Sequence, residues 1–489
     1  MPNDFSRLGF IAKGSMPYII IMTNNMKKPR LFQTISFACI LTFCAATARA
    51  QQILTKPEWL PQLSLGVTQS YDDNIFGVSG LGMPKQEAWI TKISAGMGVE
   101  FVPLFGKQTV IQELLLNYTP DFVFFELPEN KAPGNEPSQS YNAHKFGTAI
   151  KGAEGDFSFS LDNAFLYNDG SRKAETYALS QGGAADELDK YRNNFAHAMA
   201  RERLNQLQDR ETTMLRYDWA PAFVRLTDSV LDYNMNTYWH NTSAAPYEGY
   251  VNYVKRSDVN GGFDLGYKVT PEVAITLGYR YGSQYQQKFP KYITGDYAHY
   301  SSSDYQQVLL GAEGKPWKWL EFKMAGGPDF RDYNQNAPVP ELHPVKYYGE
   351  ASLKATITAN QNLSFKYKQW EWVQSTGFVP EWNSSYALGY HYNVTQQLGF
   401  DMVGMIQELD YTSANDVAGL APGDRIDRLY TLAPGVTYAF TPQLIAGLNY
   451  TYDAGNNELA NTDLPAAAKQ TAYRNYIHNL VSLSLLYKF

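Results

Sequence analysis

The chain has 489 residues, of which 15% are aromatic, and it carries a formal net charge of -7 at pH 7. This charge, without a basic cluster, excludes nucleic-acid binding as a main function. The mean hydropathy of -0.37 excludes a bundle of transmembrane helices, but not a β-barrel, in which only alternate residues meet lipid. Tyrosine, the commonest aromatic residue here, suits the two rims of such a lipid-facing band.

An export signal is predicted over residues 26–50. It has a basic start (K-K-P-R), an apolar stretch over residues 35–46 and the small-residue motif Ala48-Arg49-Ala50. The apolar stretch is short for a transmembrane anchor, so we predict cleavage between Ala50 and Gln51.

The rest of the chain divides simply around this signal. Residues 1–25 precede a signal that is complete without them, and we interpret them as an extension upstream of the true start. Residues 51–489 are predicted to form one barrel domain. Cys39 and Cys44 both lie within the signal, so this domain relies on neither disulfides nor thiol chemistry.

From residue 51 onward, runs of alternating apolar and polar residues are separated by two kinds of connection. Short turns with Thr, Pro, Asn or Gln recur at 269–272, 358–361, 394–397 and 440–443. Longer polar connections are expected at 127–138, 169–189, 226–249 and 457–475. This asymmetry is typical of outer-membrane barrels, with short periplasmic turns and long extracellular loops.

The alternating runs predict an all-β fold, a transmembrane antiparallel up-and-down β-barrel of about eighteen strands with both termini periplasmic. Sixteen strands is the alternative, because the runs over residues 190–225 are the least regular. A change of phase near Gln369 is interpreted as a bulge. The strands are predicted to begin near Leu63, Trp89, Gln108, Ser140, Asp156, Tyr191, Thr212, Tyr253, Val273, Asp304, Leu320, Lys346, Asn362, Trp382, Leu398, Ile426, Leu444 and Tyr476.

The last run, Tyr476–Phe489, alternates up to the final residue, which is aromatic. Chain ends usually fray unless a sheet holds them, so we interpret this run as the strand that closes the barrel. The alternative is an edge strand of a soluble sandwich. The apolar face of the closing strand carries a C-terminal signature made of Leu483, Leu485, Tyr487 and Phe489.

If the apolar residues face lipid, the alternate positions line the lumen. Positive and negative side chains there are close to balance, which predicts no strong ion selectivity. The candidate lumen-lining residues are Lys92, Glu113, Asp121, Arg216, Asp218, Arg280, Glu321, Lys323, Asp329, Arg331, Glu350, Lys354, Lys366, Lys368, His391 and Asp401.

Two roles stay open for these charges. Lys366 and Lys368 are expected to face Glu350 or Asp401 and bias the pore, or the charges pair across the lumen and stiffen its wall. The segment Leu226–Gly249, rich in Tyr, is a candidate for a loop that folds inward to narrow the pore. The alternative is an exposed surface loop.

Enzyme signatures are missing from the sequence. The seven histidines are scattered without zinc-ligand spacing, and no nucleophile elbow or phosphate-binding loop is present. His391, between Tyr390 and Tyr392, is interpreted as a wall residue of the lumen rather than a base. We therefore predict no enzymatic activity, no cofactor and no metal site.

The hexapeptide Tyr71-Asp72-Asp73-Asn74-Ile75-Phe76 follows the first predicted strand. It resembles the hallmark of an outer-membrane β-barrel porin family, beta-barrel porin type 2. The resemblance implies an outer-membrane barrel, and some relatives occur with exopolysaccharide export systems. The two Asp and the Asn are also residues that cap a turn by side-chain to backbone hydrogen bonds; a cation site is the second choice.

The sequence therefore predicts a channel in the bacterial outer membrane through which small polar solutes diffuse. One alternative is an outer-membrane component of exopolysaccharide export, in which luminal Tyr and Trp stack on sugars. Another is a structural or adhesive barrel that acts through its loops. The expected partners are outer-membrane lipid, the barrel assembly machinery and, in the export alternative, sugars or exopolysaccharide.

Overall fold

The computed structural model describes residues 57–75, 85, 87–105, 110–126, 140–171, 204–236, 255–286, 302–333, 345–372, 381–411, 425–459 and 476–489. The predicted extension, the signal over residues 26–50 and its cleavage between Ala50 and Gln51 lie outside these ranges. They stay predictions.

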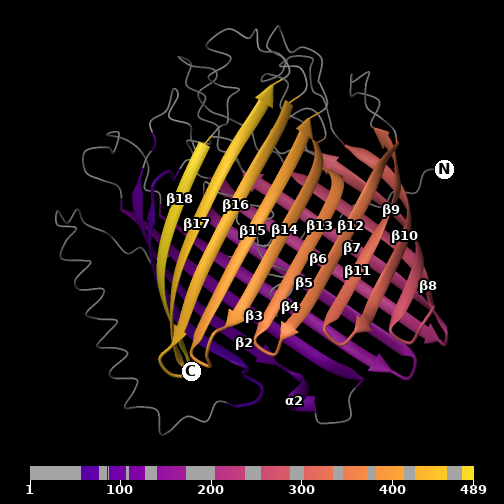
Figure 1. Cartoon of the computed structure of the whole chain (residues 1–489), viewed down its shortest axis with the longest axis horizontal. Coiled ribbons are helices and arrows are strands. Elements are labelled where there is room, and N and C mark those ends of the chain that lie inside the picture. Colours follow the sequence, from indigo (N-terminus) through magenta and orange to yellow (C-terminus); the bar gives the residue numbers. More distant parts are fainter. Residues whose placement is uncertain are drawn as a thin grey trace, which may run out of the picture. The chain divides into compact units, whose positions relative to one another are not determined.

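One antiparallel sheet of eighteen strands closes on itself, because each strand pairs with the next and β1 pairs with β18 (Figure 1). This confirms the predicted barrel and its strand count. The strands are β1 (Gln62–Asp72), β2 (Ala88–Glu100), β3 (Ile111–Glu126), β4 (Tyr141–Glu154), β5 (Phe157–Ser171), β6 (Leu204–Trp219), β7 (Ala222–Asn236), β8 (Arg256–Lys268), β9 (Val273–Gln286), β10 (Ser303–Trp317), β11 (Leu320–Tyr333), β12 (Val345–Thr358), β13 (Gln361–Trp372), β14 (Glu381–Asn393), β15 (Leu398–Tyr411), β16 (Arg425–Ala439), β17 (Leu444–Leu459) and β18 (Tyr476–Lys488).

The short helix α2 (Val102–Phe105) follows β2. Over the ranges given above, no helix is both long enough and apolar enough to cross a membrane.

Most strands present apolar residues mainly to the outside and polar residues mainly to the lumen. In β9, Leu277 and Tyr281 are 53% and 52% exposed, whereas Thr276 and Gln284 on the other face are buried. Large apolar side chains are exposed in the same alternating way on the other strands. Successive residues of a strand point to opposite faces, so one sequence pattern produces both surfaces.

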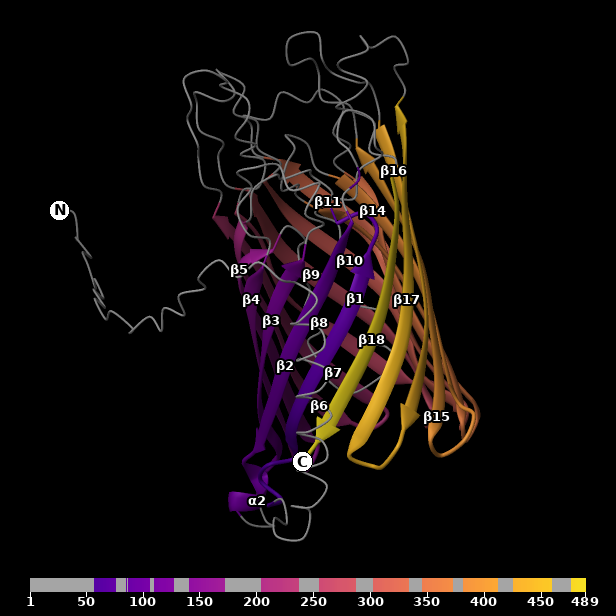
Figure 2. The same cartoon turned by 90° about the vertical axis from the view of Figure 1, so that its left-hand side faces the viewer.

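The two ends of the barrel differ in how they are connected (Figure 2). At one end, here the short-turn end, β8–β9, β14–β15 and β16–β17 are joined by turns of one design. Thr270, Thr395 and Thr441 each accept backbone N–H groups from the residues two and three positions later, at 2.9–3.3 Å. The first residues of β1 and the last residue of β18 lie at this same end.

Two-residue turns use other chemistry at the short-turn end. Gly155, between β4 and β5, has a φ of 59°, the left-handed conformation that favours glycine. At the other end, here the long-connection end, the strands are joined through the connections that the structure does not describe.

The sequence prediction was wrong around β6. Strands were predicted to begin near Tyr191, which lies outside the described residues, and near Thr212, which lies inside β6. The alternation fails because the outward positions of β6 include Asp209 and Glu211, so polar residues occupy both faces. The other predicted starts fall within three residues of the observed ones.

Because the strands around β6 were misplaced, the connection predicted after them was misplaced too. Leu226–Gly249 was predicted to be a loop, but its first part, up to Asn236, belongs to β7. The residues after Asn236 lie outside the described residues. β6 and β7 are joined by a turn at Ala220 and Pro221 that the sequence analysis did not find.

Candidate functional site

All of the predicted lumen residues occupy inward-facing positions, alternate to the exposed apolar residues of their strands. They are Lys92 on β2, Glu113 and Asp121 on β3, Arg216 and Asp218 on β6, Arg280 on β9, Glu321, Lys323, Asp329 and Arg331 on β11, Glu350 and Lys354 on β12, Lys366 and Lys368 on β13, His391 on β14, and Asp401 on β15. The structure joins some of them in networks and leaves others in local pairs.

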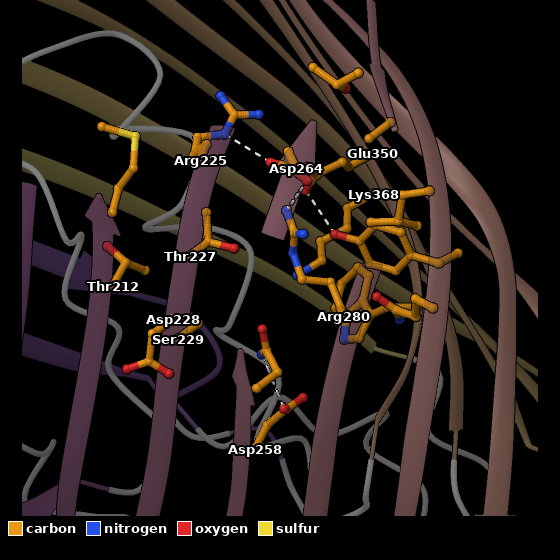
Figure 3. Close-up of a pocket in the computed structure, with 18 of the residues that line it drawn as sticks. Thr212, Arg225, Thr227, Asp228, Ser229, Asp258, Asp264, Arg280, Glu350 and Lys368 are labelled. Atoms are coloured by element: carbon orange, nitrogen blue, oxygen red, sulfur yellow. Dashed lines mark hydrogen bonds and ion pairs between the residues drawn. The ribbon is translucent and has the colours of Figure 1, made fainter. Parts of the chain in front are cut away.

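Near the short-turn end, a network of ion pairs connects β6 to β10. Arg225 binds Asp264 at 2.8 Å, as Figure 3 shows, and also binds Glu313 at 2.8 Å. Arg280 reaches the second oxygen of Asp264 at 2.7 Å. Arg216 lies 3.5 Å from Glu313, which places three arginines and two carboxylates in one linked group.

An aromatic ring lies beneath this network. The guanidinium of Arg216 is 3.7 Å from the centroid of the Phe223 ring, and Phe223 is only 1% exposed. A Cβ on Gly266 would lie 2.0 Å from that ring, so only glycine leaves room for Phe223 there. Packing on the inner face of β8 therefore fixes the floor of the network.

Elsewhere the wall carries local pairs. Asp121 binds Lys145 at 2.8 Å and accepts a hydrogen bond from Ser94. Lys151 pairs with Glu113, a more exposed contact. His391 lies 2.6 Å from Asp401, its cross-strand partner.

Only one of the two lysines predicted to face a carboxylate, Lys368, does so in the strand register. Lys368 is opposite Glu350 in the register of β12 and β13, while Lys366 is opposite Ser352. Asp401 is opposite His391, not opposite either lysine.

A polar cavity of about 440 Å³ lies above the Arg225 network. Its wall comes from strands β5 to β13, and Figure 3 shows Glu350 and Lys368 on one side with Thr227 and Ser229 on the other. The hydroxyl of Tyr348 donates to Glu350 at 2.8 Å. Trp370 and Glu371, at the end of β13, also line this cavity.

The end of β13 leaves the barrel wall. The register of β12 and β13 stops at the pair Gly349–Gln369, although β12 continues to Val345 and stays paired with β11. Over Trp370–Trp372, the strand keeps only its ladder with β14. The phase change near Gln369 therefore marks a departure from the wall, because no register shift toward β14 occurs there.

Side chains from distant strands hold this end inside the lumen. Gln284 of β9 donates its amide to the backbone carbonyl of Glu371 at 2.9 Å, although β10, β11 and β12 lie between β9 and β13 in the wall. The Glu371 carboxylate accepts from Tyr333 at 2.7 and 2.8 Å, and lies 3.5 Å from Arg331 and 3.4 Å from Lys346. Glu371 is 0% exposed.

The ring of Trp372 reaches the opposite wall. It lies 6.2 Å from the ring of Tyr233 on β7, edge to face, and the guanidinium of Arg256 on β8 is 5.1 Å from its centroid. Tyr233 and Trp372 are both buried. The end of β13 thus spans the lumen from β11 and β12 to β7 and β8.

A buried polar layer continues from Glu371 into β9–β11. Arg331 binds Asp329 through two nitrogens at 3.0 Å, and also donates to Gln284 and Ser303. Asp329 accepts a third hydrogen bond, from Gln307, at 2.8 Å. These groups satisfy one another, which buried charges require.

Arg225, Glu313 and Glu371 were missed by the sequence analysis. Arg225 was lost because the turn before β7 was not found, so the parity of that strand was unknown. Glu371 has the parity of an outward residue and turns inward only because its strand end leaves the wall. A carboxylate at a lipid-facing position between two tryptophans is the signal that identifies such a residue.

The predicted hallmark lies at the seam between β1 and β18. Asp73 accepts hydrogen bonds from the backbone N–H and the side-chain amide of Asn479, both at 2.7 Å. Asp72 accepts the backbone N–H of Asn74 and lies 2.9 Å from His478. Asn74 in turn donates to the carbonyl of Ile477 at 2.9 Å.

These contacts assign the polar residues of the hexapeptide to barrel closure. Tyr71 donates to Glu87 at 2.6 Å, on the side of β2. Ile75 is buried, and Phe76 lies outside the described residues. In the part of the chain that the structure describes, no group of three potential ligands is placed to hold a metal ion.

The C-terminal signature lies at the other end of the same seam. Leu483 and Phe489 are exposed on the outer face, and Leu485 and Tyr487 are half-buried between them. The rings of Tyr487 and Phe489 pack edge to face at 4.9 Å. The backbone N–H of Phe489 donates to Leu63, so pairing continues to the last residue.

No protein-family model matches this chain, and no curated protein matches it. Among solved structures, it is similar to OccAB2 from Acinetobacter baumannii (12% identity, TM-score 0.41, covering 89% of this chain and 99% of that one). It is also similar to OpdK from Pseudomonas aeruginosa with vanillate (11%, 0.40, 88% and 98%). The FrpB iron transporter from Neisseria meningitidis is a third such structure (12%, 0.40, 88% and 67%). At these values the similarities carry no argument about function or substrate.

Proposed function

We propose that this protein is a channel of the bacterial outer membrane through which small polar solutes diffuse, without catalytic activity. The observation that carries the proposal is the contrast between the two faces of the closed barrel. Apolar side chains are exposed on the outer face, whereas charged and hydroxyl side chains line the inner face. Such an arrangement suits a wall with lipid on one side and water on the other.

Aromatic residues on the outer face support a membrane location. Trp219, Trp317 and Phe489 are exposed near the short-turn end, and Trp89 and Tyr347 near the long-connection end. Aromatic girdles of this kind occur where a barrel meets the two lipid–water interfaces. In the proposed orientation the short-turn end, with both chain ends, is periplasmic. Delivery then requires the predicted signal, cleaved after Ala50, and the barrel assembly machinery.

Passage of small solutes is favoured over polymer export. An exopolysaccharide chain needs a continuous wide path, but the end of β13 and the buried layer around Arg331 occupy part of the lumen. The cavity below them has the size of a small-molecule site.

Planar-bilayer recording tests the proposal. Protein expressed with residues 26–50 replaced by a standard export signal is purified from outer membranes in detergent and added to a bilayer. We expect discrete current steps and weak ion selectivity, because the luminal charges are close to balance. The matched control is the same preparation from cells that lack the gene. Folded, heat-modifiable protein that gives no current steps would contradict the channel.

A further inference from the structure

We propose that the end of β13, Trp370–Trp372, is a barrier inside the lumen that limits the size of the solutes that pass, and that Glu371 holds it in place. The inference rests on the proposed channel function. It identifies the part of the lumen where the path of the solutes is narrow. It assigns this role to a wall strand instead of a loop.

The anchors of the barrier come from three directions. Gln284 holds the backbone at Glu371, while Arg331, Lys346 and Tyr333 hold its carboxylate. On the far side, Trp372 packs against Tyr233 and Arg256. A strand end fixed on opposite walls narrows the space between them.

The barrier has an alternative position that the register defines. Past the pair Gly349–Gln369, the same register would pair Tyr348 with Trp370 and Tyr347 with Glu371. That zipped position would return the strand end to the wall and widen the lumen. It would also move Glu371 to the outer face beside Tyr347, which is 70% exposed.

The charge of Glu371 therefore selects between the two positions. Facing inward, the carboxylate has two cations and a tyrosine hydroxyl; facing outward, it would meet the lipid interface. A neutral side chain removes both the inward attraction and the outward penalty. Substitution of Glu371 thus favours the zipped position.

Selection by size, not by sign of charge, follows from the composition of the barrier and its contacts. Four cations contact the barrier or the groups that hold it, and four anions contact the barrier, these groups or the cations themselves, so their fields largely cancel. They are Arg256, Arg331, Lys346, Lys368, Asp258, Asp329, Glu350 and Glu371.

A matched pair of variants tests the barrier. Glu371→Gln and Glu408→Gln each neutralise a carboxylate paired with an arginine near the long-connection end, but the Glu408–Arg428 pair lies on the outer face. We expect Glu371→Gln to raise single-channel conductance about threefold and to admit larger sugars in liposome swelling. The double variant Trp370→Ala, Trp372→Ala should act in the same direction. Glu408→Gln should match the unsubstituted protein.

The outcomes separate this inference from the channel itself. Normal currents that neither Glu371→Gln nor the double tryptophan variant changes would overturn the barrier and leave the channel intact. If the unsubstituted protein and all variants fold correctly but give no current, both the channel and the barrier would be overturned. Currents that rise equally in Glu371→Gln and Glu408→Gln would also overturn the barrier.

Cross-linking provides a readout that does not depend on current. Residues 51–489 contain no cysteine, so a Tyr233→Cys, Trp372→Cys protein carries only the two introduced thiols after signal cleavage. We expect a short bis-maleimide to join them, as detected by mass spectrometry, and to keep conductance low even with Glu371→Gln. Leu226→Cys with Trp372→Cys is the control, because Leu226 is exposed on the outer face. Absence of the first cross-link would overturn the inward position.

Discussion

Two pairs of neighbouring strands end differently at the long-connection end. Between β1 and β18 the ladder runs to Asp72–Leu480, and Asp73 and Asn74 add further bonds between the strands. Between β12 and β13 it stops at Gly349–Gln369, and the side chain of Glu371 bonds to groups inside the lumen. Polar side chains extend the wall in the first case and keep a strand away from it in the second. The position of one carboxylate decides whether a strand end belongs to the wall or to the lumen.

The largest loss of stability is expected from a substitution among the groups that hold the end of β13. Arg331→Met leaves Asp329 and Glu371, both 0% exposed, without their shared arginine. We expect the free energy of unfolding to fall by about 3–5 kcal/mol, as for other broken buried ion pairs. Urea unfolding in vesicles, followed by tryptophan fluorescence, measures it.

Arg428→Met is the control for this experiment. Arg428 pairs with Glu408 and Glu458 on the outer face, where its side chain is 30% exposed. Its substitution should cost less than about 1 kcal/mol. Equal losses in the two variants would contradict the distinct role of the inner network.

At the seam, Asp73→Ala should cost about 2–3 kcal/mol, because it removes both hydrogen bonds to Asn479. The variant should also lose heat-modifiable migration at a lower temperature in gel electrophoresis. Thr91→Ala is the control, since it removes a hydrogen bond to Gln69 between β1 and β2, away from the seam. If Asp73→Ala lowers the free energy of unfolding no more than Thr91→Ala does, the hydrogen bonds of Asp73 have no special role in closing the barrel.

The floor of the luminal network gives a smaller effect. Gly266→Ala forces Phe223 to move, and overpacking of this kind costs about 1–3 kcal/mol. Gly404→Ala, where an added Cβ meets no atom within 4 Å, should be close to neutral. Phe223→Leu should restore part of the stability in the Gly266→Ala background, and failure to do so would contradict the contact.

The smallest expected effects concern the turns. Thr270→Ala, Thr395→Ala and Thr441→Ala each remove an acceptor of two exposed backbone bonds and should cost about 0.5–1.5 kcal/mol. Serine at the same positions keeps the hydroxyl and should retain most of the stability. Conductance should be unchanged in all of them, because these turns lie outside the cavity.

Much of the fold could be predicted from the sequence, because a barrel wall repeats one local rule. Alternation located the starts of strands such as β9 and β14 to within one residue, and the Thr-containing turns fixed their ends at the short-turn end. The rule failed where it was violated locally. Asp209 and Glu211 on the outer face of β6 hid that strand, and the parity of Arg225 was lost with it.

The candidate site was less predictable, because it depends on contacts between distant strands. Parity placed Arg331 and Asp329 on the inner face, but no local pattern connects them with Glu371, whose own parity points outward. Only the change of phase near Gln369 signalled the departure of β13. A bulge and a departing strand give the same sequence pattern.

The early end of the β12–β13 ladder gives the closed barrel a short free edge. Over Val345–Tyr347, β12 has its ladder with β11 on one side, and the β12–β13 ladder does not extend to these residues on the other. Main-chain groups along such an edge need solvent, since hydrocarbon offers them no acceptor or donor. The level of Tyr347 therefore marks an upper bound for the hydrocarbon on this wall. Deuterium should enter these amides sooner than those of the seam strands.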